Sequence, residues 1–414
     1  MGHSLWIKFL MLGSIRNLWR SPRRTIISLL AIASAATALI VFQSFVEGVR
    51  STFRENVITS RFGHYQLYHK DARSSKNPDP HKYLISDIPN LKQELQQNVG
   101  PVTFVSRQQQ FFGLLSNGDS STGGVGLGID AKEEQDFLTL TQVHSGKHLS
   151  ESGKESIFIG YEFAEKIGAK VGQYITVVVT TAEGSINALD LEVVGTFKSG
   201  VTEMDRSMYM IHYETAQDLI GTDGAQRILI GFDAEDETVY QKKFQAYMQA
   251  KHPKVEVVHW ESLATYFENT MGWLDSIFFI FRIIIILIAT LSIVNVFTIT
   301  LLERTGEFGT LRAIGTKRSE IITMVLIEGF IQAVAGSILG VLGGIAVIKL
   351  ALTAGISMPP PLLMSVPFHV QFAVPWAGVG LTAFLCTFIA GGSGIMPAIK
   401  MSRINIVQAL GRNV

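Results

Sequence analysis

The chain has 414 residues, of which 47% are hydrophobic and only 17% are charged, and its mean hydropathy is +0.28. Soluble domains carry about 25% charged residues, so this composition excludes a wholly soluble protein and places much of the chain in lipid. The 35 basic and 35 acidic residues cancel overall, but residues 50–275 hold 21 basic and 30 acidic residues, a net charge of −9. The basic excess therefore lies in the flanks and short loops, where membrane topology is set, and we expect no nucleic-acid partner.

The N-terminal segment predicts a membrane anchor. Residues 1–24 contain apolar residues at helical spacing with lysine and arginine between them, which indicates an amphipathic elbow helix on the cytoplasmic leaflet. Residues 25–47 are almost uninterruptedly apolar and reach the length of about 20 residues that a spanning helix needs. A cleavable signal peptide is the alternative, because residues 33–35 are small, but the apolar run continues well past them.

Residues 48–270 have the alternating pattern of a folded extracytoplasmic domain. Two stretches, 48–130 and 220–270, predict an α+β core, and residues 131–219 predict a β-rich insertion. Period-two alternation indicates strands, and apolar residues three and four apart indicate helices. The main expected strands are 62–69, 102–115, 174–181, 189–197, 227–232 and 255–259, and the expected helices are 88–97 and 239–248.

The chain then returns to the membrane three times. Apolar spans are expected at 277–302, 321–352 and 372–395, joined by the segments 303–320 and 353–371 and followed by a tail at 396–414. The 303–320 segment holds four basic residues, whereas 353–371 holds none, so the former and both termini are expected to be cytoplasmic. The predicted fold is an α-helical membrane protein with four transmembrane helices and a large α+β extracytoplasmic domain that contains a β-rich inserted subdomain.

The cytoplasmic segment 303–320 predicts a docking helix. Phe308, Leu311 and Ile314 are three residues apart, as on one face of a short helix. Glu328, one or two turns inside the next span, is placed to pair with Arg304 or Arg312.

Glycines in the third span predict close helix packing. Gly336, Gly340 and Gly344 stand four residues apart, a double G-x-x-x-G pattern that lets a second helix approach to backbone contact. We expect the facing groove to come from glycines of the fourth span, namely Gly391, Gly392 and Gly394.

The sequence contains no pattern typical of an active site. It has no G-x-x-x-x-G-K-[ST] loop for ATP, and its histidines are scattered along the chain. The single cysteine, Cys386, excludes an internal disulfide and a thiolate metal cluster. We therefore expect neither a catalytic site, nor a metal site, nor a cofactor in this chain.

Several stretches together resemble the ABC-transporter permeases that include the MacB, LolC/LolE and FtsX proteins. Residues 303–315 are similar to the family's cytoplasmic signature, 15–25 to its N-terminal elbow, and 160–173 with 191–197 to its inserted β-rich subdomain. Residues 397–410 resemble the C-terminal signature, with asparagine and isoleucine at 405–406 where a proline is usual. The length and layout are similar to the LolC/LolE class.

The resemblance implies that this permease works with partners. Two such chains, identical or paralogous, would assemble with a dimer of a separate cytoplasmic ABC ATPase, which would hold ATP and Mg. The ATPase would grip the docking segment and pass its stroke to the external domains. The coupling residues implied by the match are Glu303, Arg304, Glu307, Phe308, Leu311, Arg312, Ile314 and Gly315.

The resemblance also implies a bacterial inner-membrane protein that extracts a lipoprotein or similar amphiphile from the membrane lipid and passes it to a periplasmic carrier. An acyl chain is expected to enter between the first two spans, although plain lipid contact explains these residues as well. Two alternatives remain open: MacB-like efflux with a periplasmic adaptor, and FtsX-like signalling to an external hydrolase. The expected path residues are Ile40, Phe42, Phe45, Phe278, Phe281 and Ile284.

Overall fold

The computed structural model divides the chain into two compact units. The membrane unit comprises residues 1–52, 271–357 and 369–414, and the sheet unit comprises 53–270 and 358–368. Residues 1–21 of the predicted elbow, the proline-containing loop at 359–367 and the tail beyond 402 lie outside the described residues, and residues 22–24 belong to the first long helix. The described residues are 22–74, 81–86, 88, 90–135, 137, 141–233, 237–355, 357–358, 368–369, 372, 374 and 376–402.

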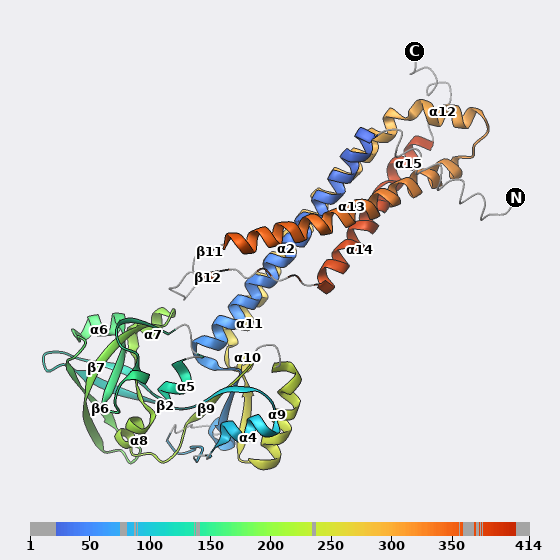
Figure 1. Ribbon diagram of the computed structural model, residues 1–414. Coiled ribbons are helices and arrows are strands. Elements are labelled where there is room, and N and C mark those ends of the chain that lie inside the picture. Colours follow the sequence, from blue (N-terminus) through green and yellow to red (C-terminus); the bar gives the residue numbers. More distant parts are fainter. Residues whose placement is uncertain are drawn as a thin grey trace. The chain divides into compact units, whose positions relative to one another are not determined.

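Four helices of the described chain are long and apolar enough to cross a membrane (Figure 1). They are α2 (Pro22–Val57), α11 (Thr265–Glu303), α13 (Arg318–Ala354) and α14 (Trp376–Ser393), the last of which continues into α15 (Ile395–Ser402). A short helix, α12 (Thr305–Ala313), connects α11 to α13. The prediction of four transmembrane helices with a large α+β domain is confirmed.

Local signals explain where the helices around α12 begin and end. Arg304 leaves helical geometry at φ −98° and ψ 16°, which separates α11 from α12. Gly315 has a φ of +100°, in the left-handed region that glycine adopts without a Cβ penalty, so the chain turns sharply after α12. The next helix, α13, then starts with a capping box in which the amide of Lys317 donates to Glu320 at 2.9 Å.

Helices α2 and α13 pack closely through the G-x-x-x-G glycines. A Cβ placed on Gly336 would lie 2.7 Å from Cβ of Ile32, and one placed on Gly340 would lie 2.8 Å from the carbonyl oxygen of Ala33. The expectation that the glycines of the fourth span form the facing groove is wrong. The glycines of α13 instead face Ile32, Ala33 and Ile40 of α2, and Gly391 of α14 faces the ring of Phe330.

The sheet unit is built on ten strands. Antiparallel pairing predominates, and β3 with β8 and β5 with β7 form the parallel pairs. Strand β6 (Tyr174–Thr180) pairs with both β2 and β7. The remaining order is β10 (Val255–His259), β1 (Tyr65–His69), β9 (Arg227–Phe232), β2 (Val102–Ser116), β3 (Ser121–Ile129), β8 (Met208–His212), β5 (Ser156–Gly160), β7 (Ile186–Lys198) and β4 (Gln142–Gly146).

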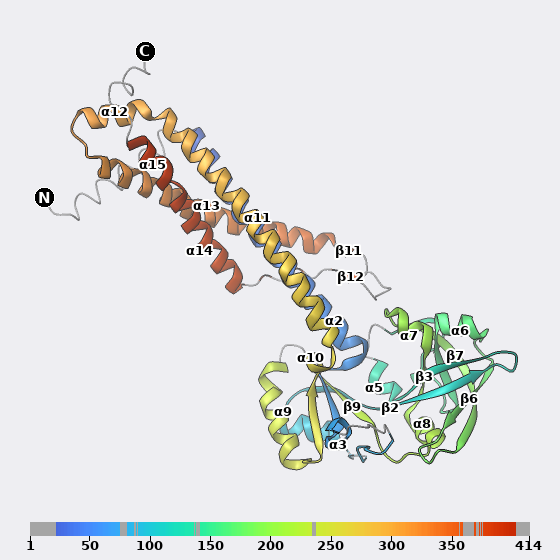
Figure 2. The same cartoon turned by 180° about the vertical axis from the view of Figure 1, so that it is seen from behind.

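Short helices accompany this sheet (Figure 2). The predicted helix at 88–97 appears as α4 (Leu91–Asn98), and the one at 239–248 as α9 (Glu237–Lys251). The others are the π-helical turn η1 (Ile58–Phe62), α3 (Lys70–Ser74), α5 (Ala131–Gln135), the 3-10 turn η2 (Leu149–Glu151), α6 (Tyr161–Ile167), α7 (Thr202–Ser207), α8 (Tyr213–Ile220) and α10 (Trp260–Leu263). Two-residue strands, β11 (Ser357–Met358) and β12 (Phe368–His369), pair with each other.

Strand β2 supplies residues to two hydrophobic cores of the sheet unit. Its first residue, Val102, is buried with Leu95 and Phe244, from α4 and α9. Its far end contributes Leu115 to a second core, with Val177 of β6. The core of the predicted β-rich insertion, residues 131–219, therefore also contains residues from outside that range. This is possible because β2 is long enough to reach both cores.

Candidate functional site

The segment predicted to dock an ATPase contains α12, and one face of this helix is buried in the membrane unit. Phe308 is only 4% exposed and packs in a cluster with neighbours from the adjoining helices. Leu311 is partly buried against the same cluster. The buried neighbours of Phe308 are Leu301, Ile321, Val325 and Ala398.

This packing divides the residues of the predicted docking face into buried and exposed ones. Phe308 and Leu311 face inward, because α13 and α15 supply apolar partners for them, whereas Ile314 is 77% exposed. The outward-facing surface, which we call the α12 outer face, is formed by side chains that are exposed in the structure. These are Glu303, Glu307, Thr310 and Ile314, with the backbone of Gly315.

A buried ion pair holds the start of α12 against α13. Nη1 of Arg304 donates to both carboxylate oxygens of Glu328, at 2.9 and 2.8 Å, and Nε donates to Glu307 at 2.9 Å. Burial disfavours the charge on Arg304, but the adjacent Glu328 carboxylate outweighs burial and raises the pKa of the guanidinium. Of the two partners considered for Glu328, Arg304 is therefore the one that binds it.

The same guanidinium also lies over the ring of Phe308, with Cζ 5.3 Å from the ring centroid. The Arg304 and Glu328 side chains are 7% and 9% exposed, so both charges are largely removed from water. An ion pair of this kind is held strongly because either charge would be stranded without the other. Arg304, Glu328 and Phe308 thus fix α12 to the long helices on either side.

The expected acyl-path residues divide into two groups. Phe42 of α2 lies edge-on to Phe278 of α11, with ring centroids 6.0 Å apart, and Phe281 lies 6.4 Å from Phe42. Phe45 contacts Phe278 at 6.4 Å. Phe281 and Ile284 are 52% and 44% exposed on α11. The four phenylalanines form an aromatic cluster between α2 and α11.

Ile40 does not belong to this cluster. It is 1% exposed and covers Gly344, so the structure places it against α13, away from the aromatic rings. Phe372, which the sequence interpretation missed, joins the cluster through Phe45 at 6.2 Å. The sequence does indicate Phe372 as a candidate, because an aromatic residue at the start of an apolar span is typical of a membrane interface.

Comparisons with known proteins agree with this architecture. Residues 25–247, more than half of the chain, match the MacB-like periplasmic core domain, and residues 279–406 match the FtsX-like permease C-terminal domain. The lipoprotein-releasing system transmembrane protein LolC of Neisseria meningitidis is 24% identical over 335 residues, which cover 78% of this chain and 76% of LolC.

A second relative is longer than the region that it shares with this chain. The pyoverdine export ATP-binding/permease protein PvdT of Pseudomonas syringae is 25% identical over 95% of this chain, which spans 58% of PvdT. The periplasmic region of MacB from Actinobacillus actinomycetemcomitans aligns with 51% of this chain and 96% of its own length, at a TM-score of 0.38 and 14% identity. With a MacB-like core domain followed by an FtsX-like C-terminal domain, the chain belongs to the MacB/LolC/FtsX family of ABC-transporter permeases.

Proposed function

We propose that this permease transmits force from a separate cytoplasmic ATPase, through the α12 outer face, to the sheet unit in the periplasm of a bacterium. The observation that carries the proposal is the clamped position of α12. Its inner face is anchored by Phe308 and by the Arg304–Glu328 ion pair, while Ile314 and Glu307 remain exposed. An exposed surface on a rigid support is what a docking partner requires.

The clamp explains how a push on α12 would reach the membrane helices. A flexible loop would absorb displacement, whereas a helix tied by a buried ion pair and an aromatic core moves with α11 and α13. ATP and Mg belong to the ATPase in this scheme, and a second permease copy or a paralogue completes the complex. The permease contributes no chemical step.

For the cargo, we propose a lipoprotein or another amphiphile of the inner membrane. The LolC relative, whose name describes a lipoprotein-releasing system, matches similar shares of both chains. The aromatic cluster of Phe42, Phe45, Phe278, Phe281 and Phe372 offers an apolar surface for an acyl chain. A periplasmic carrier would then receive the cargo.

A second candidate is efflux with a periplasmic adaptor. The match of residues 25–247 to the MacB-like periplasmic core domain favours it. FtsX-like signalling is the third, and the match of residues 279–406 to the FtsX-like C-terminal domain favours it. All three share the entry of force at α12, and they differ in what the sheet unit acts on.

The docking assignment is tested by Ile314→Asp. Because Ile314 is 77% exposed, the change leaves the fold intact, whereas Leu311→Asp would also disturb the core under α12. We expect the tagged full-length variant to insert normally but to lose the ATPase that co-purifies with the wild-type chain. Ile186→Asp, at a 79% exposed position of the sheet unit, is the matched control and should retain the ATPase. Equal ATPase recovery with Ile314→Asp would refute docking at this face.

The cargo assignment needs a separate experiment. Proteoliposomes containing the co-purified complex and a fluorescent triacylated lipoprotein would be given ATP and a soluble acceptor for acyl chains. We expect ATP-dependent transfer to the acceptor. Robust ATP hydrolysis without transfer would overturn the lipoprotein proposal while leaving the docking proposal standing.

A further inference from the structure

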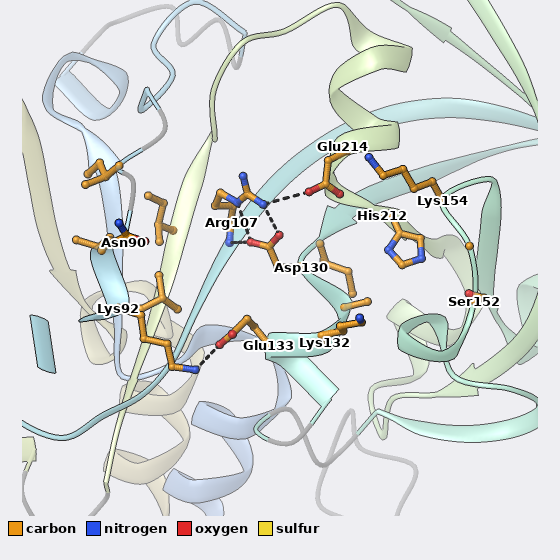
Figure 3. A pocket seen from close by; sticks show the side chains of 17 residues that line it. Asn90, Lys92, Arg107, Asp130, Lys132, Glu133, Ser152, Lys154, His212 and Glu214 are labelled. Atoms are coloured by element: carbon orange, nitrogen blue, oxygen red, sulfur yellow. Dashed lines mark hydrogen bonds and ion pairs between the residues drawn. The ribbon is translucent and has the colours of Figure 1, made fainter. Parts of the chain in front are cut away.

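The sheet unit contains a pocket of about 640 Å³ that none of the family features above accounts for. Its walls come from α4, β2, the end of β3 with α5, the loop before β5, and the start of α8 (Figure 3). These segments are far apart in the sequence, so no local motif reveals the pocket. Its volume is within the range of 300–1,000 Å³ that is typical of small-molecule sites.

The carboxylates of this pocket already form ion pairs with basic side chains of the protein. Arg107 donates to both oxygens of Asp130, at 2.9 and 2.7 Å, and to Glu214 at 3.3 Å. Lys92 binds Glu133 at 2.6 Å. Figure 3 shows two separate groups, one centred on Arg107 and the other formed by Lys92 with Glu133. The acidic side chains are therefore neutralised from within the protein.

Two other lysines of the pocket do not pair with its carboxylates. Lys132 and Lys154 both line the cavity, and neither ammonium group has an ion-pair partner among the residues that the structure describes. His212 lies beside them, and its Nε2 is buried with no hydrogen-bond partner. Burial lowers the pKa of His212, so its imidazole is neutral at pH 7. The unbalanced charge that faces the cavity is thus positive, and a neutral imidazole is available for a hydrogen bond.

Apolar side chains complete the lining. Val105 of β2, Ile129 of β3, Ala131 of α5 and Ile228 of β9 line the pocket. An inorganic anion would leave this apolar part of the wall in contact with water. A ligand with an anionic group at one end and a short apolar body satisfies both kinds of surface.

We propose that this pocket binds a small anionic amphiphile, with its charged group between Lys132 and Lys154 and its apolar body over Val105, Ile129 and Ile228. The phosphate of a glycerophospholipid and a free phosphate share the head-group chemistry, but only the former has the apolar body. The proposal concerns binding alone, so it depends neither on the docking of an ATPase nor on the identity of the cargo.

The test uses the full-length protein in phosphatidylcholine nanodiscs and three soluble probes. Dihexanoyl phosphatidylglycerol has the charge and the apolar body, dihexanoyl phosphatidylcholine has the body without a net charge, and inorganic phosphate has the charge alone. Binding is titrated by saturation-transfer NMR after subtraction of empty nanodiscs. We expect the phosphatidylglycerol probe to bind at least tenfold more tightly than either of the others.

The variant Lys132→Gln with Lys154→Gln locates the site. Both side chains are exposed, so the fold should be unaffected, and we expect at least a tenfold loss of affinity for the phosphatidylglycerol probe. The control variant, Lys166→Gln with Lys170→Gln, removes two exposed lysines outside the pocket and should bind as the wild type does. Unchanged affinity in the pocket variant overturns the proposal. Equal binding of inorganic phosphate overturns the requirement for an apolar body, and equal binding of the phosphatidylcholine probe overturns the requirement for charge.

Discussion

Removing Arg304 should destabilise the membrane unit far more than the loss of a surface charge would. In Arg304→Met, the Glu328 carboxylate loses both of its hydrogen bonds from Nη1, at 2.9 and 2.8 Å, while its side chain stays 9% exposed. A buried charge stranded in this way costs about 3–5 kcal/mol. In the double variant Arg304→Met with Glu328→Gln, no charge is stranded, so we expect most of that loss to be recovered.

The free energy of unfolding can be followed at a single site. Cys386 is the only cysteine of the chain and is 6% exposed on α14, so a thiol-reactive fluorogenic dye reports the opening of the membrane unit. Titration with a denaturing detergent gives the free energy of unfolding for the wild type, for Arg304→Met, for Glu328→Gln and for the double variant. The coupling energy of this cycle should be about 2 kcal/mol or more.

Glu307→Gln is the matched control. Glu307 also binds Arg304, but its side chain is 57% exposed, so its removal should cost less than about 1 kcal/mol. A loss in Arg304→Met no larger than that in Glu307→Gln would refute the reasoning, and so would a coupling energy near zero. Either result would mean that water reaches the ion pair and that α12 is not clamped.

Two further predictions concern packing and pH. Gly336→Val should destabilise the membrane unit by about 1–3 kcal/mol in the same thiol assay, because its Cβ would meet Ile32 at 2.7 Å, whereas Gly380→Val, with nothing within 4 Å, should have little effect. In the sheet unit, burial raises the pKa of Glu134 from 4.5 to about 7. The folded state therefore holds more protons than the unfolded state between these values, and stability should fall by about 3 kcal/mol as the pH rises from 4.5 to 7. Hydrogen exchange in β2 should show this fall, and Glu134→Gln should abolish it.

Strand positions were predictable because their signal is local. The strands β9 and β10 coincide with the predicted ranges 227–232 and 255–259, since short apolar runs bounded by turn residues define both ends. The pairing of Glu328 with an arginine of the cytoplasmic segment was also predictable, because an acidic residue inside an apolar span requires a partner.

The choice of inward and outward faces was not predictable in the same way. Helical spacing puts Phe308 and Ile314 on a common apolar stripe, but it does not say which neighbours will cover that stripe. Helices α13 and α15 cover Phe308 and leave Ile314 exposed. The pocket around Lys132 and Lys154 was hidden for the same reason, because its walls meet only in the folded sheet unit.

The most direct test of force entry at α12 is a contact measurement in native membranes. A photo-crosslinking phenylalanine analogue at Ile314, which is 77% exposed, should give a light-dependent adduct with an ATP-binding subunit. The same analogue at Ile186, 79% exposed in the sheet unit, should give none with that subunit. If Ile314 forms no adduct with an ATPase while the chain is correctly inserted, α12 is not where ATP-driven force enters this protein.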